Sequence, residues 1–235
     1  MIGRPWDGTT WKLLYGSAFR VPNAYERYYA GVGQLANPDL QPEQIRTYEA
    51  VWEQDFGSRR RASLSYFQNR IKNLISQSVV AGGRQFLNQE RVRTEGAELH
   101  GKAELTRTWS GHAGYILQST RVQGGDRLSN SPTHVANLGL SRRLAWWDAD
   151  VAFDSFLVSA RITNDGGHLP TTGLMSLHAR LWPLQNRLSV YGGVHNVFDT
   201  DHRVSGSSEH VQSAIPQDGR NFNLGLEYRF GGRSS

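Results

Sequence analysis

The stretch that indicates the fold most clearly is Phe222-Asn223-Leu224-Gly225-Leu226-Glu227-Tyr228-Arg229-Phe230, near the end of the chain. Every even position holds an apolar side chain, and every odd position holds a polar side chain or Gly. This alternation is typical of a β-strand whose two faces meet different surroundings. A slip of one residue would carry Glu227 and Arg229 into the apolar phase, so the register of the strand is sharply defined.

The same alternation recurs toward the N-terminus and predicts about ten strands of about ten residues, the length with which a tilted strand crosses the hydrocarbon layer. Besides the last strand, they cover residues 11–20, 46–56, 62–75, 94–105, 112–121, 134–143, 148–158, 173–182 and 188–198. Within 148–158 the polar phase carries Asp148, Asp150 and Asp154, which a lipid-facing surface would not tolerate. We therefore expect one face to meet water and the other to meet hydrocarbon. A closed interior would contradict this if it buried the apolar phase, which includes Met175, Leu177, Leu224, Leu226 and Tyr228.

The predicted connections alternate between short and long. The short ones lie near residues 57–59, 106–108, 144–146 and 183–186, and the long ones cover residues 21–45, 76–93, 122–133, 159–172 and 200–221. Short turns at one end and long loops at the other are typical of outer-membrane β-barrels, whose long loops are extracellular. Aromatic residues gather at the strand ends, as in interfacial girdles. They are Phe56, Trp109, Trp146, Trp147, Trp182 and Phe230 beside the short turns, and Phe19, Tyr25 and Phe198 beside the long loops.

Composition excludes several classes of protein. With 38% hydrophobic residues and a mean hydropathy of −0.54, the chain has no apolar run of about 18 residues, so a helical membrane protein is excluded. The absence of Cys excludes a disulfide scaffold or a thiolate metal site. A net charge of +5 invites a nucleic-acid partner, but the Lys and Arg residues are scattered and Arg59-Arg60-Arg61 lies at a turn, so we expect none. The first residues lack the features of a signal peptide, so an exported protein would need a further N-terminal part.

Several short motifs follow one another in a fixed order. The first pair is Tyr15-Gly16-Ser17-Ala18-Phe19-Arg20-Val21-Pro22-Asn23-Ala24-Tyr25-Glu26 and Asn37-Pro38-Asp39-Leu40-Gln41-Pro42-Glu43, followed by Tyr48-Glu49 and Glu53. Later come Thr94-Glu95-Gly96-Ala97-Glu98-Leu99, Pro132-Thr133-His134 with Asn137-Leu138, Asn196-Val197-Phe198-Asp199, and Pro216 with Gly219-Arg220. In kind, spacing and order they resemble the C-terminal barrel of TonB-dependent outer-membrane receptors, over residues from about Trp11 to Phe230.

The resemblance implies an all-β fold, an antiparallel transmembrane β-barrel of which this chain supplies about ten meandering strands of 22. It divides the chain into an N-terminal stub at residues 1–10, a barrel segment at 11–230 and a tail at 231–235. Family members usually end at the terminal Phe that the assembly machinery recognises, whereas five residues follow Phe230 here. The plug, the energy-coupling box and the signal peptide have no counterpart, so we expect a fragment that cannot transport alone. The motif residues expected to have structural roles are Phe19, Arg20, Pro22, Glu26, Asn37, Pro38, Leu40, Pro42, Glu43, Tyr48, Glu49, Gly96, Asn196, Phe198, Gly219, Arg220 and Phe230.

Physical roles can be assigned to some of these residues. Pro22, Pro38 and Pro42 fix φ and so stiffen a long exposed loop. Gly96 and Gly101 are expected at bulges or at points of close backbone approach. The glutamates of the polar phase are expected to line the lumen, which in the family holds the plug; they are Glu49, Glu53, Glu98 and Glu104.

The resemblance also implies a function, the uptake of a scarce ligand such as a ferric siderophore, cobalamin or haem across the outer membrane of a Gram-negative bacterium. Its implied partners are outer-membrane lipid, the ligand, the TonB energy-coupling protein through the missing plug region, and the barrel assembly machinery through the last strand. No catalytic residue, cofactor or resident metal is expected. Aromatic and Arg residues are the usual anchors of binding surfaces. The candidate ligand contacts in the loops are Tyr25, Arg27, Tyr28, Tyr29, Arg84, Phe86, His168, Arg203 and His210.

Two other classes of protein remain open from the residues alone. A small closed outer-membrane barrel with protease or lipase activity could use Asp165 with His168, or Asp201 with His202, although the chain has no Gly-x-Ser-x-Gly, Walker, His-Glu-x-x-His or GxGxxG motif. A soluble β-sandwich binding module or adhesin would require the even phase of the last strand to be buried against protein.

Overall fold

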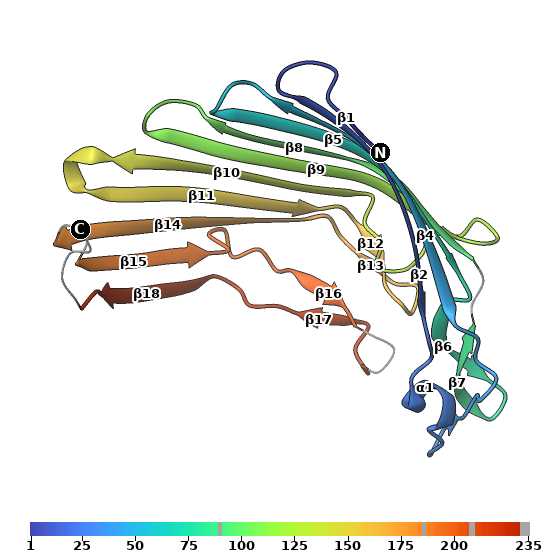
Figure 1. Ribbon diagram of the computed structural model, residues 1–235. Coiled ribbons are helices and arrows are strands. Elements are labelled where there is room, and N and C mark those ends of the chain that lie inside the picture. Colours follow the sequence, from blue (N-terminus) through green and yellow to red (C-terminus); the bar gives the residue numbers. More distant parts are fainter. Residues whose placement is uncertain (89–90, 185–186, 207–209, 231–235) are drawn as a thin grey trace.

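The computed structural model describes residues 1–88, 91–184, 187–206 and 210–230. Its main element is one antiparallel sheet of 11 strands, in the order β1-β2-β4-β5-β8-β9-β10-β11-β14-β15-β18. Figure 1 shows that this sheet bends into an open arch, with the N-terminal strands at one margin and β18 at the other. Each strand pairs with the next one in the sheet along the chain, so the sheet is a meander, as predicted.

The ten long strands lie where the alternation predicts them. The strands of the main sheet are β1 (Ile2–Gly3), β2 (Thr9–Arg20), β4 (Glu43–Asp55), β5 (Arg60–Lys72), β8 (Val92–Glu104), β9 (Trp109–Val122), β10 (His134–Leu144), β11 (Ala149–Val158), β14 (Thr172–Leu184), β15 (Leu188–His195) and β18 (Asn221–Tyr228). The all-β, antiparallel architecture predicted from the sequence is therefore confirmed.

The long connections carry small elements of their own, which the sequence did not predict. They are α1 (Ala24–Tyr28), β3 (Gln34–Leu35), β6 (Ile75–Val80), β7 (Gly83–Asn88), β12 (Arg161–Ile162), β13 (His168–Leu169), β16 (Arg203–Ser205) and β17 (Ala214–Pro216). β3, β7 and β6 form a three-stranded sheet, and the other two pairs form two-stranded sheets. A 3-10 turn, Ala145–Trp147, fills one short connection. No described helix has the length and apolarity to cross a membrane.

Three strands end two or three residues before the predicted position. β5 ends at Lys72 and not at residue 75, because Asn73 adopts a left-handed conformation with φ of 58°. β15 ends at His195 and not at residue 198, because Asn196 does the same with φ of 49°. The last strand ends at Tyr228, two residues before Phe230. The predicted tail at residues 231–235 and part of the turn at 183–186 lie outside the described residues.

The cross-strand register sorts the side chains of the main sheet into two faces, because residues directly opposite one another share a face. The face with Trp11, Tyr15, Tyr48 and Trp52 is called the apolar face; Trp11 is opposite Trp52, and Tyr15 is opposite Tyr48. The other is called the polar face. It carries rows such as Arg143-Asp150-Arg180 and contains all four glutamates predicted to line the lumen, Glu49, Glu53, Glu98 and Glu104.

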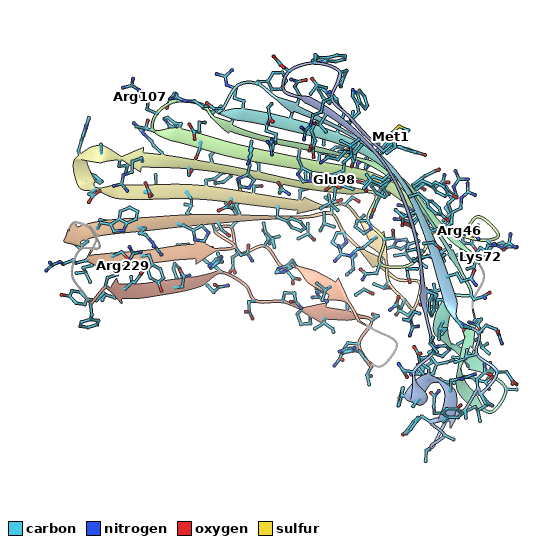
Figure 2. All side chains as sticks on the ribbon, viewed as in Figure 1. Met1, Arg46, Lys72, Glu98, Arg107 and Arg229 are labelled. Atoms are coloured by element: carbon cyan, nitrogen blue, oxygen red, sulfur yellow. The ribbon has the colours of Figure 1, made fainter. Side chains whose placement is uncertain are left out.

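Within the described part of the chain, no protein covers the apolar face. Leu177 is 48% exposed, Leu224 84% and Leu226 67%. Of the described hydrophobic residues, those that are buried are Leu40, Ile75, Val92, Ala149 and Leu169. Side chains project from both faces of the arch in Figure 2. The apolar residues of the described strands therefore do not form the closed interior that a soluble β-sandwich needs.

The two glycines of β8 differ. A Cβ atom added to Gly96 would lie 2.5 Å from the Leu117 carbonyl oxygen, so the predicted close backbone approach is confirmed there. A Cβ atom added to Gly101 would have no heavy atom within 4 Å, so the same prediction is wrong for that residue. The register between β8 and its neighbours runs without a bulge at either position.

Candidate functional site

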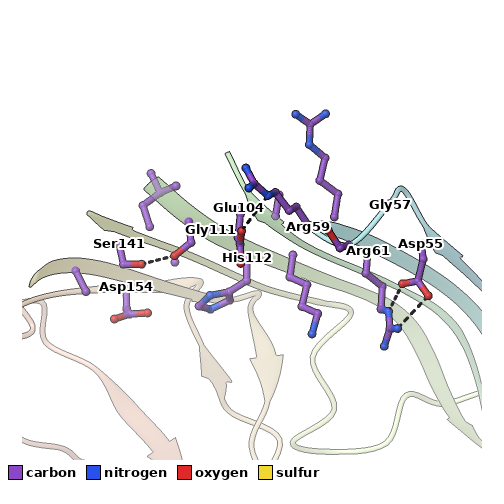
Figure 3. A pocket seen from close by; sticks show the side chains of 17 residues that line it. Asp55, Gly57, Arg59, Arg61, Glu104, Gly111, His112, Ser141 and Asp154 are labelled. Carbon is purple, nitrogen blue, oxygen red and sulfur yellow. Dashed lines mark hydrogen bonds and ion pairs between the residues drawn. The ribbon is translucent and has the colours of Figure 1, made fainter. Parts of the chain in front are cut away.

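The polar face forms an open hollow of about 680 Å³ near the short turns (Figure 3). Asp55, at the end of β4, accepts two hydrogen bonds from the guanidinium of Arg61, and Arg59 lies 3.6 Å from Glu104 across the neighbouring turn. His112 and Asp154 extend the hollow across β9 and β11. Charges of both signs line it, so it presents a hydrated, polar surface.

Close polar contacts continue along the polar face toward the middle of the strands. Lys12 lies 2.6 Å from Glu53, and His100 lies 2.5 Å from Glu98. Each of these side chains is 32% to 52% exposed, so the pairs remain in contact with solvent. Exposed pairs contribute about 0–1 kcal/mol each. They keep the face polar and nearly balanced in charge, and they contribute little to stability.

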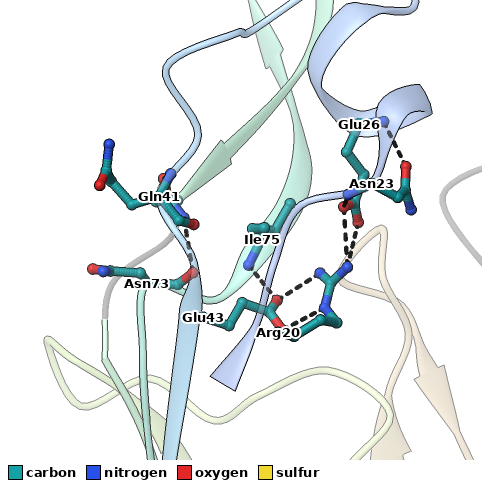
Figure 4. A network of polar contacts seen from close by, with 8 residues as sticks. Arg20, Asn23, Glu26, Gln41, Glu43, Asn73 and Ile75 are labelled. Carbon is teal, nitrogen blue, oxygen red and sulfur yellow. Dashed lines mark hydrogen bonds and ion pairs between the residues drawn. The ribbon is translucent and has the colours of Figure 1, made fainter.

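At the loop end, Arg20 links three segments of the chain (Figure 4). Its Nε and Nη2 atoms donate to Glu43 at 2.6 and 2.8 Å, and its Nη1 atom donates to both oxygens of Glu26 at 2.9 and 3.0 Å. Glu43 also accepts a hydrogen bond from the Ile75 backbone N–H at 2.7 Å. One guanidinium therefore fastens the end of β2 to α1 and to the start of β4, and Glu43 extends the connection to β6.

The charges in this network stabilise one another. Hydrogen bonds from Arg20 hold the pKa of Glu43 below its usual value, against a smaller opposing effect of burial. The same two carboxylates raise the pKa of Arg20. The side chain of Glu43 is 15% exposed and that of Glu26 is 11% exposed, so both carboxylates are largely withdrawn from water.

The short helix α1 begins with a capping box. Asn23 Oδ1 accepts from the Glu26 N–H, and Glu26 Oε2 accepts from the Asn23 N–H, both at 2.8 Å. This reciprocal pair satisfies backbone donors at the start of the helix. Glu26 thus caps the helix and also accepts hydrogen bonds from Arg20, which explains how a helix of five residues is held in place.

The second motif of the first pair is fastened to the β6–β7 hairpin. Asn37 Nδ2 donates to the Phe86 carbonyl at 2.8 Å. Asn88 exchanges two hydrogen bonds with the backbone of Gln41, at 2.8 and 2.9 Å. Leu40 is 2% exposed and anchors the segment. Sequence reasoning did not single out Ile75 and Asn88, because their hydrogen-bond partners are more than 30 residues away in the chain.

The later motifs also meet in space. Asn196 exchanges two hydrogen bonds of 2.9 Å with the backbone of Thr200, and the Asp199 carboxylate accepts from the Arg220 N–H at 2.7 Å. A Cβ atom at Gly219 would lie 2.7 Å from Asp199 Oδ1. The turn after β15 therefore holds the segment that leads into β18, and a side chain at position 219 would displace the Asp199 carboxylate from this contact.

Some of the candidate ligand contacts form an aromatic group on α1 and β7. The rings of Tyr25 and Tyr29 stack with centroids 4.7 Å apart, and Phe86 lies edge-on to Tyr25 at 5.9 Å. The guanidinium of Arg27 lies 5.8 Å from the centroid of the Tyr28 ring and also donates to the Pro38 carbonyl. The structure thus brings together five of the nine candidates, Tyr25, Arg27, Tyr28, Tyr29 and Phe86, on one loop cluster.

Other candidates line an open hollow of about 780 Å³ between the loop hairpins. Arg84 and Phe86 enter it from β7, and His210 enters it from the connection between β16 and β17. Asp165 lies on its wall, and a hydrogen bond from the Thr163 hydroxyl holds the pKa of that carboxyl below its usual value. Phe86 belongs to both groups of candidates, so it joins the aromatic cluster to the hollow.

The last two candidates lie elsewhere on the hairpins. His168 is opposite Ile162 in the β12–β13 pair, and Arg203 pairs with Asp201 at 3.2 Å. The Asp165 carboxylate, considered for a catalytic pair with His168, accepts instead from Thr163 and from the Gly167 N–H. Across the described residues, no group of three or more His, Asp or Glu side chains is arranged to hold a metal ion.

Comparison with known proteins identifies relatives of this chain. The family described as TonB dependent receptor-like, beta-barrel, matches residues 4–197. An iron-regulated outer membrane virulence protein of Vibrio cholerae serotype O1 is 24% identical over 242 residues, which cover 91% of this chain and 36% of that protein.

Solved structures show the same fold. The copper transporter OprC superposes with a TM-score of 0.81 at 21% identity and covers 97% of this chain and 38% of its own. The FrpB iron transporter of Neisseria meningitidis gives a TM-score of 0.74 at 20% identity, with 97% and 37% covered. The ferripyoverdine receptor of Pseudomonas aeruginosa gives 0.76 at 20% identity, with 97% and 32% covered. The chain therefore spans about a third of the length of these proteins.

Proposed function

Because the chain belongs to the TonB-dependent receptor family, as its β-barrel region, we propose that it forms part of the wall and the extracellular loops of a receptor for a scarce metal chelate. It lies in the outer membrane of a Gram-negative bacterium, as members of this family do. The family is one of receptors and transporters and not a class of enzymes. The observation that carries the proposal is the sorting of the sheet into an exposed apolar face and a charged polar face, with the large loops at one end.

The ligand that we propose is a ferric siderophore, with other metal chelates, cobalamin and haem as the alternatives that the experiment separates. Support comes from the loop cluster, where the rings of Tyr25 and Tyr29 stack and Phe86 lies edge-on to Tyr25, beside the hollow that Arg84 and His210 line. Rings and cations together suit an anionic metal chelate, since aromatic and Arg side chains are the usual binding anchors. Named relatives are an iron-regulated protein and iron and copper transporters.

We propose that residues 11–230 act within a longer receptor. The remaining strands and a plug would complete the barrel, and the plug would reach the TonB protein. The charged hollow with Asp55, Arg61 and Asp154 is the surface that we expect to contact the plug, because its balanced charges suit a polar protein surface. The last strand is the segment expected to engage the assembly machinery. On this proposal transport requires the longer receptor, in which the plug couples the barrel to an energy source.

Growth experiments test the proposal. The complete reading frame that contains this chain is expressed in a receptor-deficient strain, which is grown on ferric siderophores, haem, cobalamin or a copper source as the limiting nutrient. We expect growth on one ferric siderophore class, and a loss of at least tenfold in uptake of that radiolabelled chelate when Tyr25 and Phe86 are both changed to Ala.

The matched control removes an aromatic ring from the other end of the strands. Trp146, which is 97% exposed in a short turn, is changed to Ala. We expect uptake within twofold of that of the unchanged protein. Equal uptake by the Tyr25→Ala/Phe86→Ala variant would overturn the loop-cluster assignment, and growth on none of the sources would overturn the receptor proposal itself.

A further inference from the structure

Four arginines stand side by side on the outward, apolar face of the sheet, at its loop end. Arg46 is directly opposite Arg70, Arg70 is opposite Arg93, and Arg93 is opposite Arg121. They occupy the four adjacent strands β4, β5, β8 and β9. With neighbouring strands about 4.8 Å apart, the row is about 15 Å long. We call these residues the arginine row.

Like charges placed directly opposite one another on a sheet are destabilising. Within the described part of the chain, Arg93 has a carboxylate partner, Glu95, at 2.7 Å, whereas no carboxylate pairs with Arg46, Arg70 or Arg121. Arg70 donates to Gln68 and lies 5.9 Å from the Tyr48 ring centroid, and Arg121 donates to a backbone carbonyl. All four side chains are exposed. The row therefore carries a surplus of positive charge that anions from outside the chain would relieve.

The arginine row borders an open hollow of about 450 Å³. Arg46, Arg70 and Arg93 line it, and two more exposed cations, Lys72 and Arg91, stand on its loop side. Figure 2 shows Arg46 and Lys72 close together at this end of the sheet, away from Glu98 on the polar face. Five cations around one hollow make a site for a group with more than one negative charge.

On the opposite side of the row, the first position along each strand holds Tyr48, Gln68, Glu95 or Ser119, and apolar side chains follow. Tyr48 lines the same hollow, and along the strands the same face continues with Trp52, Tyr66, Leu99 and Tyr115. Each step of two residues along a strand is about 7 Å, so these aromatic and aliphatic side chains lie about one to three such steps from the arginines of their own strands. A molecule that fills the hollow and also covers this surface has a phosphorylated head and hydrocarbon tails.

We propose that the arginine row, with Lys72 and Arg91, binds the phosphorylated head group of a glycolipid in the outer leaflet of the membrane. Guanidinium groups grip phosphate in a bidentate manner, and a row of them on adjacent strands can hold two phosphates of one head group. The acyl chains lie along the apolar face below. This site is on the outside of the barrel wall and is independent of the ligand that the loops bind.

The test measures lipid retained by the receptor in detergent. The complete receptor is purified and mixed with diphosphorylated lipid A, and the bound lipid is counted by native mass spectrometry. The variant changes all four arginines of the row to Gln. The control neutralises four arginines at the short turns: Arg59, Arg60, Arg107 and Arg187. We expect the row variant to bind lipid A at least tenfold more weakly, and the control to bind it within twofold of the unchanged receptor.

Further arms identify the source of the phosphate. Dephosphorylated lipid A is expected to bind at least tenfold more weakly to the unchanged receptor, and raised salt to weaken binding of the phosphorylated form. Inorganic phosphate is expected not to compete at the concentration that saturates lipid A. If the row variant does not fold, as judged by its heat-dependent gel mobility, the pair Arg70→Gln/Arg93→Gln decides in its place. Undiminished binding by a folded variant, an equal loss in the control, or equal competition by inorganic phosphate would overturn the proposal.

Discussion

Replacing Glu43 by Gln tests how the loop cluster is fastened to the barrel wall. Glu43 accepts two hydrogen bonds from Arg20 and one from the Ile75 N–H. Gln can still accept from Ile75, but it loses the charge and places an amide group against the guanidinium. Hydrogen bonds to charged groups contribute about 1.5–3 kcal/mol, and Arg20 is 45% exposed, so solvent screening lowers the loss to about 1–2 kcal/mol.

Hydrogen exchange of the receptor in detergent measures this loss locally. Opening of the loop cluster exposes the Ile75 amide, and about 1–2 kcal/mol corresponds to roughly 5- to 30-fold less protection. Glu26→Gln should have a smaller effect than Glu43→Gln, because Ile75 is not its partner. The Glu26→Gln/Glu43→Gln double variant should lose less protection than the sum of the losses in the two single variants, since both carboxylates share Arg20.

The control is Glu104→Gln, which removes a carboxylate from the exposed pair with Arg59 at the opposite end of the strands. We expect its exchange at Ile75 to change by less than about threefold. The reasoning is refuted if Glu43→Gln leaves the Ile75 amide as protected as before, or if the control reduces protection as much as Glu43→Gln does.

Three other predictions concern pH, packing and a turn. Because the pKa of Glu43 is lowered in the folded protein, its contribution to stability is complete above the unfolded pKa of 4.5 and is lost as pH falls through the lower folded pKa. Protection of the loop cluster from hydrogen exchange, corrected for intrinsic exchange, should therefore decline only below pH 4.5. The Glu43→Gln variant should show no such decline. Gly96→Ala should destabilise the receptor by about 1–3 kcal/mol in urea unfolding, because its Cβ atom would overlap a backbone oxygen, whereas Gly101→Ala should change stability by less than about 0.5 kcal/mol. Asn196→Ala should lower the free energy of unfolding by about 2 kcal/mol in the same assay, because it loses the hydrogen bonds to Thr200 and places Ala in a left-handed conformation. Asn196→Gly should recover about half of this loss, because Gly tolerates that conformation. Equal losses in the two variants would contradict the contribution of the backbone conformation.

Alternation predicted the ten long strands because it is a local signal that repeats every two residues. It failed at strand ends, where Asn73 and Asn196 turn the backbone into a conformation that an apolar pattern does not encode, although Asn at the end of a run is a usable hint. The loop hairpins were missed because strands of two to six residues carry too little pattern.

The candidate site was harder to predict for a different reason. The sequence identified Arg20 and Glu43 as motif residues, but their contact across 23 positions depends on how β2 and β4 pair. The arginine row is invisible in the sequence, because its members are more than 20 residues apart and become neighbours only through the register. The ligand contacts in the loops stay a prediction.

The free margin of the sheet has a consequence for biogenesis. Among the described strands β18 pairs with β15 alone, so alternate peptide groups along it point outward with no acceptor or donor. Hydrocarbon offers these groups no water to bind. A sheet with an unpaired edge strand is therefore unstable in the hydrocarbon region. Pairing of β18 with its next neighbour has to accompany insertion of the sheet into the bilayer.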